Sequence, residues 1–180
     1  MIAAVVGPSA AGKDTLIEGA LAAWPGLRLA RRVITRPSDA GGEDFDGVTP
    51  AAFARMRQAG LFALDWQAHG LCYAIPRDQL AGGGPVIFNG SRAALPQALA
   101  RLPGLRVVLV TAPVALLARR LAARGRETED DIAARLDRAR FAMPPEVDHV
   151  TVQNDGTPEQ GVARLLAALQ PARYPDRALR

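Results

Sequence analysis

The nine residues Gly7-Pro8-Ser9-Ala10-Ala11-Gly12-Lys13-Asp14-Thr15 decide the fold of this chain. Residues 2–6 before them are apolar, which is typical of a short buried strand, and residues 16–24 after them are apolar at helical spacing. The glycines therefore lie on a strand-to-helix turn, the context in which G-x-x-x-x-G-K binds phosphate. Backbone N–H groups of such a turn, with the positive end of the helix dipole, attract an anion.

Lys13 is the only lysine of the chain, and the other 21 of its 22 basic residues are arginines. A compact ammonium group fits a tight phosphate loop better than a planar guanidinium does. We therefore interpret residues 7–15 as a phosphate-binding loop, called the phosphate loop below. The alternative is a glycine-rich turn that binds no ligand.

Asp14 stands where the usual motif has a serine or threonine whose hydroxyl binds magnesium. A carboxylate is also a magnesium ligand, so a metal between Asp14 and the phosphates would account for a negative charge at this position. We favour Asp14 as the metal ligand. In the alternative, Asp14 caps the helix and Thr15 binds the metal.

Composition predicts one globular domain over residues 1–170 with a loose tail at residues 171–180, because 49% of the residues are hydrophobic and 22% are charged. We find no apolar run of about 18 residues and no secretory pattern, so we expect a cytoplasmic protein without a membrane partner. The single cysteine, Cys72, excludes an internal disulfide. The net charge of +4 suits small anionic ligands; without a basic stripe interleaved with aromatic residues, we expect no nucleic-acid partner.

Apolar runs alternate with helical segments along the rest of the chain. We expect strands at 27–34, 61–68, 71–74, 85–89, 106–111 and 149–153, and helices at 49–58, 92–102, 113–123, 129–141 and 158–169. This alternation predicts an α/β fold of three layers, a parallel sheet flanked by helices. Ligands bind at the carboxyl ends of such strands, so the phosphate loop, residues 35–46, Asn89 and Asn154 should surround one cleft.

Four segments in this order resemble the guanylate kinase family of P-loop phosphotransferases. They are the phosphate loop, Thr35-Arg36-Pro37…Gly42-Glu43, Asp65-Trp66…His69-Gly70…Tyr73 and Arg124-Gly125-Arg126. The resemblance covers about residues 1–170. It implies a core that binds ATP, an acceptor-binding region at residues 32–80 and a helical lid at residues 124–140.

The acceptor segment departs from guanylate kinases at four positions. Asp39 replaces an arginine and Phe45 replaces a tyrosine, both of which bind the acceptor phosphate in that family. Asp65 and Ile75 stand where a glutamate and a serine or threonine read guanine. An apolar side chain facing a purine would leave hydrogen bonds unmade, at a cost of about 1–3 kcal/mol each. Guanine is therefore a poor candidate for the acceptor.

Arginines are gained at Arg32 and Arg92, and Asn89 ends a strand that ends in aspartate in guanylate kinases. These residues, together with four segments of the sequence, resemble the ribose 1,5-bisphosphate phosphokinases. The segments are Gly12-Lys13-Asp14 and residues 31–37, 66–71 and 86–92. The resemblance implies ATP-dependent formation of 5-phospho-α-D-ribose 1-diphosphate (PRPP) in phosphonate degradation. In the alternative of sequence drift, Ile75 is a core residue and both arginines are solvated surface. Two other functions stay open, a guanylate or other nucleoside monophosphate kinase and a non-catalytic binding module.

The resemblance also implies roles for single residues, with ATP and Mg²⁺ as cofactors and a sugar bisphosphate as the partner. The catalytic set is Lys13, Arg124, Arg126 and Arg135; the ATP set is Gly7 to Thr15 with Asn154 and Asp155; the acceptor set is Arg32, Arg36, Glu43, Asp65, Tyr73, Asn89 and Arg92. For Asn154-Asp155 the alternative is a turn and a helix cap. The oligomeric state stays open, a homodimer being one option.

Overall fold

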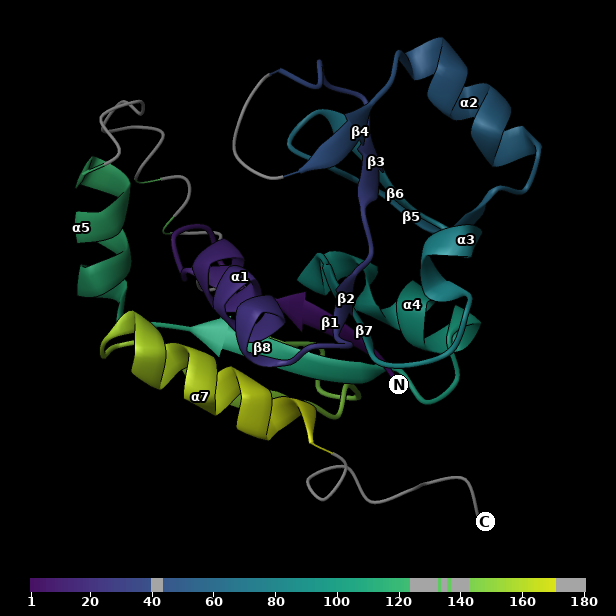
Figure 1. Cartoon of the computed structure of the whole chain (residues 1–180). Helices are drawn as coiled ribbons and strands as arrows, with labels where there is room; N and C mark the ends of the chain where they lie inside the picture. Colours follow the sequence, from purple (N-terminus) through teal and green to yellow (C-terminus); the bar gives the residue numbers. More distant parts are fainter. Residues whose placement is uncertain (40–43, 124–132, 134–135, 137–142, 171–180) are drawn as a thin grey trace.

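The computed structural model describes residues 1–39, 44–123, 133, 136 and 143–170 (Figure 1). Several sequence predictions fall outside the described residues. They are Glu43, the lid arginines Arg124, Arg126 and Arg135, nearly all of the helix expected at 129–141, and the tail at 171–180.

Among the described residues, five strands form one parallel sheet in the order β2-β7-β1-β8-β9. Their bounds are β1 Ile2–Val6, β2 Arg28–Leu29, β7 Val86–Asn89, β8 Arg106–Thr111 and β9 Val150–Gln153. Helices α1 (Lys13–Ala23), α5 (Val114–Ala123) and α7 (Pro158–Leu169) lie on one side of this sheet, as Figure 1 shows. The 3₁₀ helix η1 (Arg92–Ala94) leads into α4 (Leu95–Arg101), which contributes to the core of the other side. The predicted α/β fold with a parallel sheet flanked by helices is confirmed.

Alternate residues of the central strands enter two different cores. On β1, Ala3 and Val5 join the cluster of α1, α5 and α7, whereas Ala4 and Val6 join the cluster on the opposite face. Successive side chains of a strand point to opposite faces, so a strand covered on both sides is apolar throughout. In the described part of the chain, no helix has the length and apolar character needed to cross a lipid bilayer.

Four further strands form a second sheet in the order β4-β3-β6-β5, within the described ranges. They are β3 Arg32–Ile34, β4 Phe45–Gly47, β5 Phe62–Ala68 and β6 Leu71–Pro76. Between β5 and β6 the chain turns at His69 and Gly70, whose φ angles of 54° and 75° are both left-handed. Helices α2 (Pro50–Gln58) and α3 (Arg77–Leu80) lie beside this sheet (Figure 1). Thr49 caps α2 through a hydrogen bond from the N–H of Ala52, as the sequence predicts.

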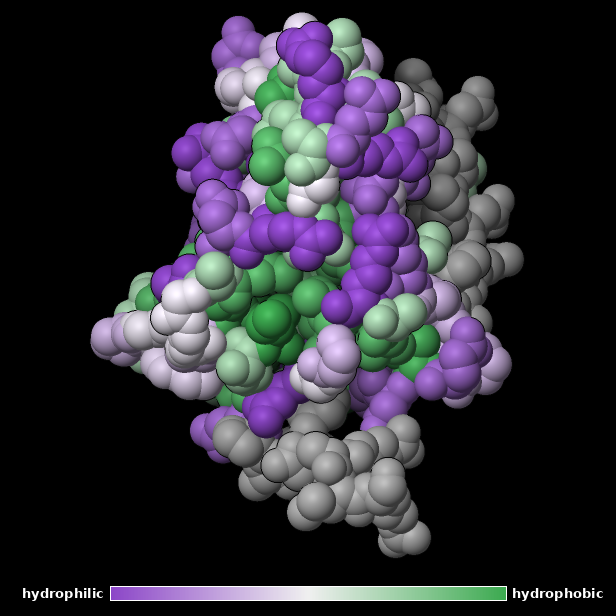
Figure 2. Space-filling model, turned by 90° about the vertical axis from the view of Figure 1, so that its right-hand side faces the viewer, coloured by the Kyte–Doolittle hydropathy of each residue, from purple (hydrophilic) through white to green (hydrophobic). Residues whose placement is uncertain are grey.

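The two sheets share a core, because Leu64 and Ile75 of the four-stranded sheet cluster with Phe88 of the five-stranded sheet. Figure 2 views the molecule from the side of α2, α3 and α4, where apolar residues are visible in a hollow bordered by hydrophilic ones. The opposite face of the four-stranded sheet forms a smaller core around Phe53 of α2 and Phe62.

The prediction of one strand at residues 27–34 is wrong, because the chain passes from one sheet to the other within it. The N–H of Ala30 still bonds to Ile87 of the five-stranded sheet at 2.8 Å, but the N–H of Arg31 bonds to the side chain of Gln79 at 3.1 Å. The pairing that continues a strand therefore stops after Ala30. This crossing brings Arg32 of β3 to the end of β7, where the candidate site lies.

Candidate active site

The phosphate loop has the strand–turn–helix context that the sequence predicts. Gly7 and Gly12 have positive φ angles of 148° and 88°, and Ala10 is a non-glycine residue at 62°. A Cβ atom on Gly7 would overlap the carbonyl oxygen of Val110, so glycine is required there for space as well as for conformation. The loop is therefore pressed against β8, and α1 begins directly after Gly12.

Lys13 folds back over the phosphate loop. Its Nζ donates to the carbonyl oxygens of Gly7 and Pro8 at 2.9 and 3.0 Å. These bonds hold the ammonium group at the loop, within which a phosphate would meet both this charge and the backbone N–H groups. The geometry suits the predicted catalytic role of Lys13, which stays a prediction.

Asp14, Asn89 and Arg32 form a chain of hydrogen bonds between the two sheets. Asn89 Nδ2 donates to Asp14 Oδ1 at 2.9 Å, and Arg32 Nη1 donates to the backbone oxygen of Asn89 at 2.9 Å. Gly12, not Asp14, occupies the N-cap position of α1. The structure thus brings together three predicted site residues from β3, β7 and α1.

Arg32 is a buried cation rather than a solvated one. The residue is only 8% exposed, and its guanidinium carbon lies 5.3 Å from the ring centroid of Tyr73. That ring in turn stacks on Trp66, at 5.6 Å between centroids and 6° between planes. The alternative that Arg32 is solvated surface is therefore wrong, and an aromatic stack positions its guanidinium.

Arg36 and Arg92 also lie in confined surroundings. The guanidinium carbon of Arg36 is 4.4 Å from the ring centroid of Phe45, a buried residue at the start of β4. Partial burial lowers the pKa of Arg92, at the start of η1, from its ordinary value. Both guanidinium groups are partly desolvated, which strengthens their attraction for an anion.

Ile75 does not face an acceptor. It is fully buried in the core shared by the two sheets, next to Leu64 across the β5–β6 pair. The prediction that it confronts a bound ligand is wrong for a simple reason: its position on β6 turns the side chain into the core between the sheets. The core alternative is correct for Ile75.

Asp65 is held by two arginines from different helices. Its Oδ2 lies 3.2 Å from Nε of Arg57 on α2, and its Oδ1 lies 3.3 Å from Nη1 of Arg101 on α4. Its side chain is only 15% exposed, so these two ion pairs are less solvated than those that Arg31 and Arg164 form in the described residues. The structure gives Asp65 a bracing role; acceptor binding by this residue stays a prediction.

Asn154 and Asp155 have different surroundings although they are adjacent. Asn154 is buried, and its Nδ2 donates to the carbonyl oxygen of Ala11 in the phosphate loop at 2.8 Å. Asp155 is exposed, and the hydrogen bond from Arg164 lowers the pKa of its carboxyl. Helix α7 is capped by Thr157, so the alternative that Asn154 or Asp155 is the helix cap is wrong.

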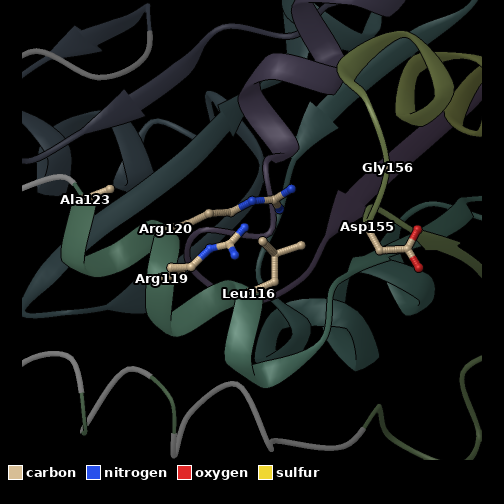
Figure 3. A pocket seen from close by; sticks show the side chains of 6 residues that line it. All are labelled: Leu116, Arg119, Arg120, Ala123, Asp155 and Gly156. Atoms are coloured by element: carbon tan, nitrogen blue, oxygen red, sulfur yellow. The ribbon is translucent and has the colours of Figure 1, made fainter.

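A pocket of about 380 Å³ lies next to the phosphate loop, between α5 and the segment after β9 (Figure 3). Its walls are Leu116, Arg119, Arg120 and Ala123 of α5, with Asp155 and Gly156 opposite. Of the predicted ATP residues, Asp155 lines this pocket directly. The pocket borders the phosphate loop and carries two guanidinium groups, so it suits an anionic ligand that continues from the loop.

Arg120 is a site residue that the sequence reasoning missed. Its Nη1 lies 3.4 and 3.5 Å from the carbonyl oxygens of Ala10 and Ala11, and its Nη2 donates to the backbone oxygen of Asn154 at 3.1 Å. A signal existed, since Leu117 and Leu121 form the buried stripe of α5 and Arg120 borders that stripe. The sequence gives no reason, however, to choose it over Arg119.

The donor set around the phosphate loop also fits a magnesium ion. Mg²⁺ in proteins is commonly bound by one or two carboxylates together with substrate phosphates. Asp14 supplies an exposed carboxylate in the first turn of α1, fixed by Asn89. Within residues 1–39, 44–123 and 143–170, no cluster of three or more His, Cys, Asp or Glu side chains is placed to hold a metal ion.

Among curated proteins, the ribose 1,5-bisphosphate phosphokinase PhnN of Agrobacterium fabrum is 46% identical over 172 residues, which cover 92% of this chain and 94% of that protein. The bifunctional ribose 1,5-bisphosphokinase-thymidine phosphorylase of Cupriavidus necator is 51% identical over 170 residues. That match covers 92% of this chain but 28% of the bifunctional protein, so the chain spans little more than a quarter of it. No family model matches the chain.

Among solved structures, guanylate kinase from Anaplasma phagocytophilum superposes with a TM-score of 0.67 at 17% identity, covering 94% of this chain and 84% of that one. A gluconokinase from Sinorhizobium meliloti superposes with a TM-score of 0.57 at 21% identity, covering 95% and 91%. At these identities the likeness shows the fold, a P-loop kinase fold. With 46% identity over nearly the full length of the Agrobacterium fabrum protein, the chain belongs to the ribose 1,5-bisphosphate phosphokinase family.

Proposed function

We propose that this protein transfers the γ-phosphoryl group of ATP to the 1-phosphate of ribose 1,5-bisphosphate, giving PRPP and ADP. The observation that carries the proposal is the hydrogen-bonded chain from Arg32 through Asn89 to Asp14. It joins a buried arginine of the four-stranded sheet to the first turn of the helix after the phosphate loop. An acceptor phosphate held at Arg32 would thus lie on the side of the loop where a γ-phosphate is expected.

The proposed transfer needs little from the protein beyond positioning and charge. An oxygen of the acceptor 1-phosphate attacks the γ-phosphorus, the bond to the β–γ bridging oxygen breaks, and ADP leaves with that oxygen. The attacking oxygen is already ionised at neutral pH, so no general base is required. Lys13 and the loop N–H groups stabilise the charge on the transferred group, while Arg32 and Arg36 bind the acceptor phosphates. The lid arginines Arg124, Arg126 and Arg135 keep their proposed role at the transferring group.

The surroundings of the acceptor side support a sugar bisphosphate over a nucleotide. Ile75 is a core residue, and each carboxylate oxygen of Asp65 contacts an arginine. Two positions read guanine in guanylate kinases. Here one is a buried apolar residue and the other is a carboxylate already paired with two arginines, so neither is well suited to bind a purine. Arg32, by contrast, is built into the site by an aromatic ring and a backbone carbonyl.

Asp14 is proposed as the protein's ligand to magnesium. The ion, when bound, neutralises charge on the phosphate oxygens. Asp14→Asn keeps the shape of the side chain and its contact with Asn89 but removes the charge. We expect the Mg²⁺ concentration that half-saturates ATP binding to rise in this variant, as measured by fluorescence of an ATP analogue. An unchanged magnesium titration would remove the role from Asp14.

Some basic residues in the described part of the chain pair with carboxylates within it, which supports small-molecule partners rather than nucleic acid. Arg31 contacts Asp44 and Asp46, and Arg57 contacts Asp65. We extend the proposal to a cytoplasmic location, since the reaction consumes ATP. The residue range 32–80 as acceptor-binding region belongs to the same proposal.

The decisive experiment is a coupled ADP assay with ribose 1,5-bisphosphate, GMP and the other nucleoside monophosphates as acceptors. We expect ADP release with ribose 1,5-bisphosphate alone, and a diphosphate product in the ³¹P NMR spectrum. Lys13→Met is the matched control and should abolish the signal with every acceptor. ADP release with GMP but not with the sugar would establish a nucleoside monophosphate kinase. Failure of the wild-type protein to bind ATP would instead favour a binding module.

A further inference from the structure

Asn154 is a buried polar residue whose hydrogen bonds to described residues go to β8, α5 and the backbone of the phosphate loop. We propose that Asn154 is a positioning residue, which fixes the peptide between Ala11 and Gly12 so that the Gly12 N–H points into the anion site. This role differs from the contact with ATP that the sequence predicts for Asn154. It rests on the ATP half of the proposed function and does not depend on the acceptor.

Three hydrogen bonds tie Asn154 into the fold. Its N–H donates to the carbonyl oxygen of Thr111 at 2.7 Å, which extends the β8–β9 pairing by one residue. Its own carbonyl accepts from Arg120, and its Nδ2 donates to Ala11 O at 2.8 Å. The residue is 5% exposed, so little of its side chain is open to a bound base.

Two glycines make the space for the Asn154 amide. A Cβ atom on Gly12 would lie 2.5 Å from Asn154 Nδ2, and a Cβ atom on Gly161 of α7 would lie 2.7 Å from Asn154 Oδ1. Both distances are shorter than real Cβ contacts. The amide is therefore held between the phosphate loop and α7, where only glycine on each side leaves room for it.

The effect on the loop follows from the geometry of the peptide bond. A trans peptide is planar, so the C=O of Ala11 and the N–H of Gly12 point in opposite directions. Asn154 holds that carbonyl toward α7, and Arg120 Nη1 approaches the same oxygen at 3.5 Å from α5. With its carbonyl held from two elements, the peptide presents the Gly12 N–H to the opposite side, where the loop encloses its anion.

Asn154→Ala tests this proposal, because it removes the donor toward Ala11 without adding a charge beside the anion site. The readouts are the dissociation constants of ATP, GTP and inorganic tripolyphosphate, which has no base. We expect the dissociation constants of ATP and tripolyphosphate to rise by the same factor, about tenfold for a lost buried hydrogen bond. The ratio of ATP to GTP affinity and the KM for the acceptor should not change.

Val152→Ala is the control for loss of stability, since Val152 is a buried core residue of β9 two positions before Asn154. It should lower the melting temperature and leave tripolyphosphate affinity unchanged. If Asn154→Ala does not fold, Asn154→Ser, which is also uncharged, replaces it with the same expected pattern.

Two results would overturn the inference. Weaker binding of ATP with unchanged tripolyphosphate binding would make Asn154 a base-reading residue. Equal weakening of tripolyphosphate in Val152→Ala at a matched loss of melting temperature would reduce its role to stability. Failure of the wild-type protein to bind either ligand would remove the proposed function itself, so the two failures are distinguishable.

Discussion

Replacing Arg32 by lysine should weaken binding of the acceptor without weakening binding of ATP. Arg32 uses Nη1 for the Asn89 carbonyl and places its guanidinium over the Tyr73 ring, while a second nitrogen is proposed to bind an acceptor phosphate. A guanidinium can do these things at once because its donors are spread over a rigid plane. Lysine has one nitrogen on a flexible chain, so it keeps the charge but must give up one of the contacts.

The size of the effect follows from the contacts that are lost. A hydrogen bond from a charged donor contributes about 1.5–3 kcal/mol, and a guanidinium over an aromatic ring about 0.5–2 kcal/mol. Arg32 is only 8% exposed, so solvent screening removes little of this. Lysine should lose about one such contact, roughly 1.5–3 kcal/mol, which corresponds to a roughly ten- to hundredfold higher KM for the acceptor.

The assay varies ribose 1,5-bisphosphate at saturating ATP, and the dissociation constant of ATP is measured separately. Arg28→Lys is the matched control, because Arg28 lies on the edge strand β2 and donates to Ala81 O and Gly83 O, outside the candidate site. An unchanged acceptor KM in Arg32→Lys would refute the reasoning, and so would an equal rise in Arg28→Lys.

Three further changes test other parts of the molecule. Gly7→Ala should abolish ATP binding and lower the melting temperature, since its Cβ would overlap Val110 O; normal ATP affinity by calorimetry would contradict this. An amine-reactive reagent should label Lys13 as the sole lysine, and ATP should slow that labelling in mass spectra; equal rates with and without ATP would place phosphate elsewhere. The bond from Arg164 depresses the folded-state pKa of Asp155, so its stabilisation is present above the unfolded-state pKa of about 4 and is lost as pH falls through the folded value. The difference in melting temperature between wild type and Arg164→Ala should therefore shrink below about pH 4 and stay constant above about pH 6; a difference independent of pH would exclude this pair as its cause.

Local patterns predicted the parts of the fold that depend on neighbours in sequence. The phosphate loop, the strand at residues 106–111 and the helix at 158–169 were predictable with their bounds, because turn glycines, an uninterrupted apolar run and a proline after Thr157 are local signals. The cap at Thr49 belongs to the same class. The break within residues 27–34 was not predictable, since it depends on where the partners Ile87 and Gln79 lie.

The sequence by itself determined that this chain has a G-x-x-x-x-G-K loop between a strand and a helix, and an arginine-rich segment, proposed to bind the acceptor, that lacks the usual purine readers. Only the tertiary structure decided what each side chain does: Ile75 lies in the core, Arg32 is buried against Tyr73, and Asn154 holds the loop from behind. The physical reason is range. A glycine turn or an apolar run depends on residues a few positions apart. The direction of a side chain is fixed by strands and helices that can lie far away along the chain, as Asn154 lies 143 positions from Ala11.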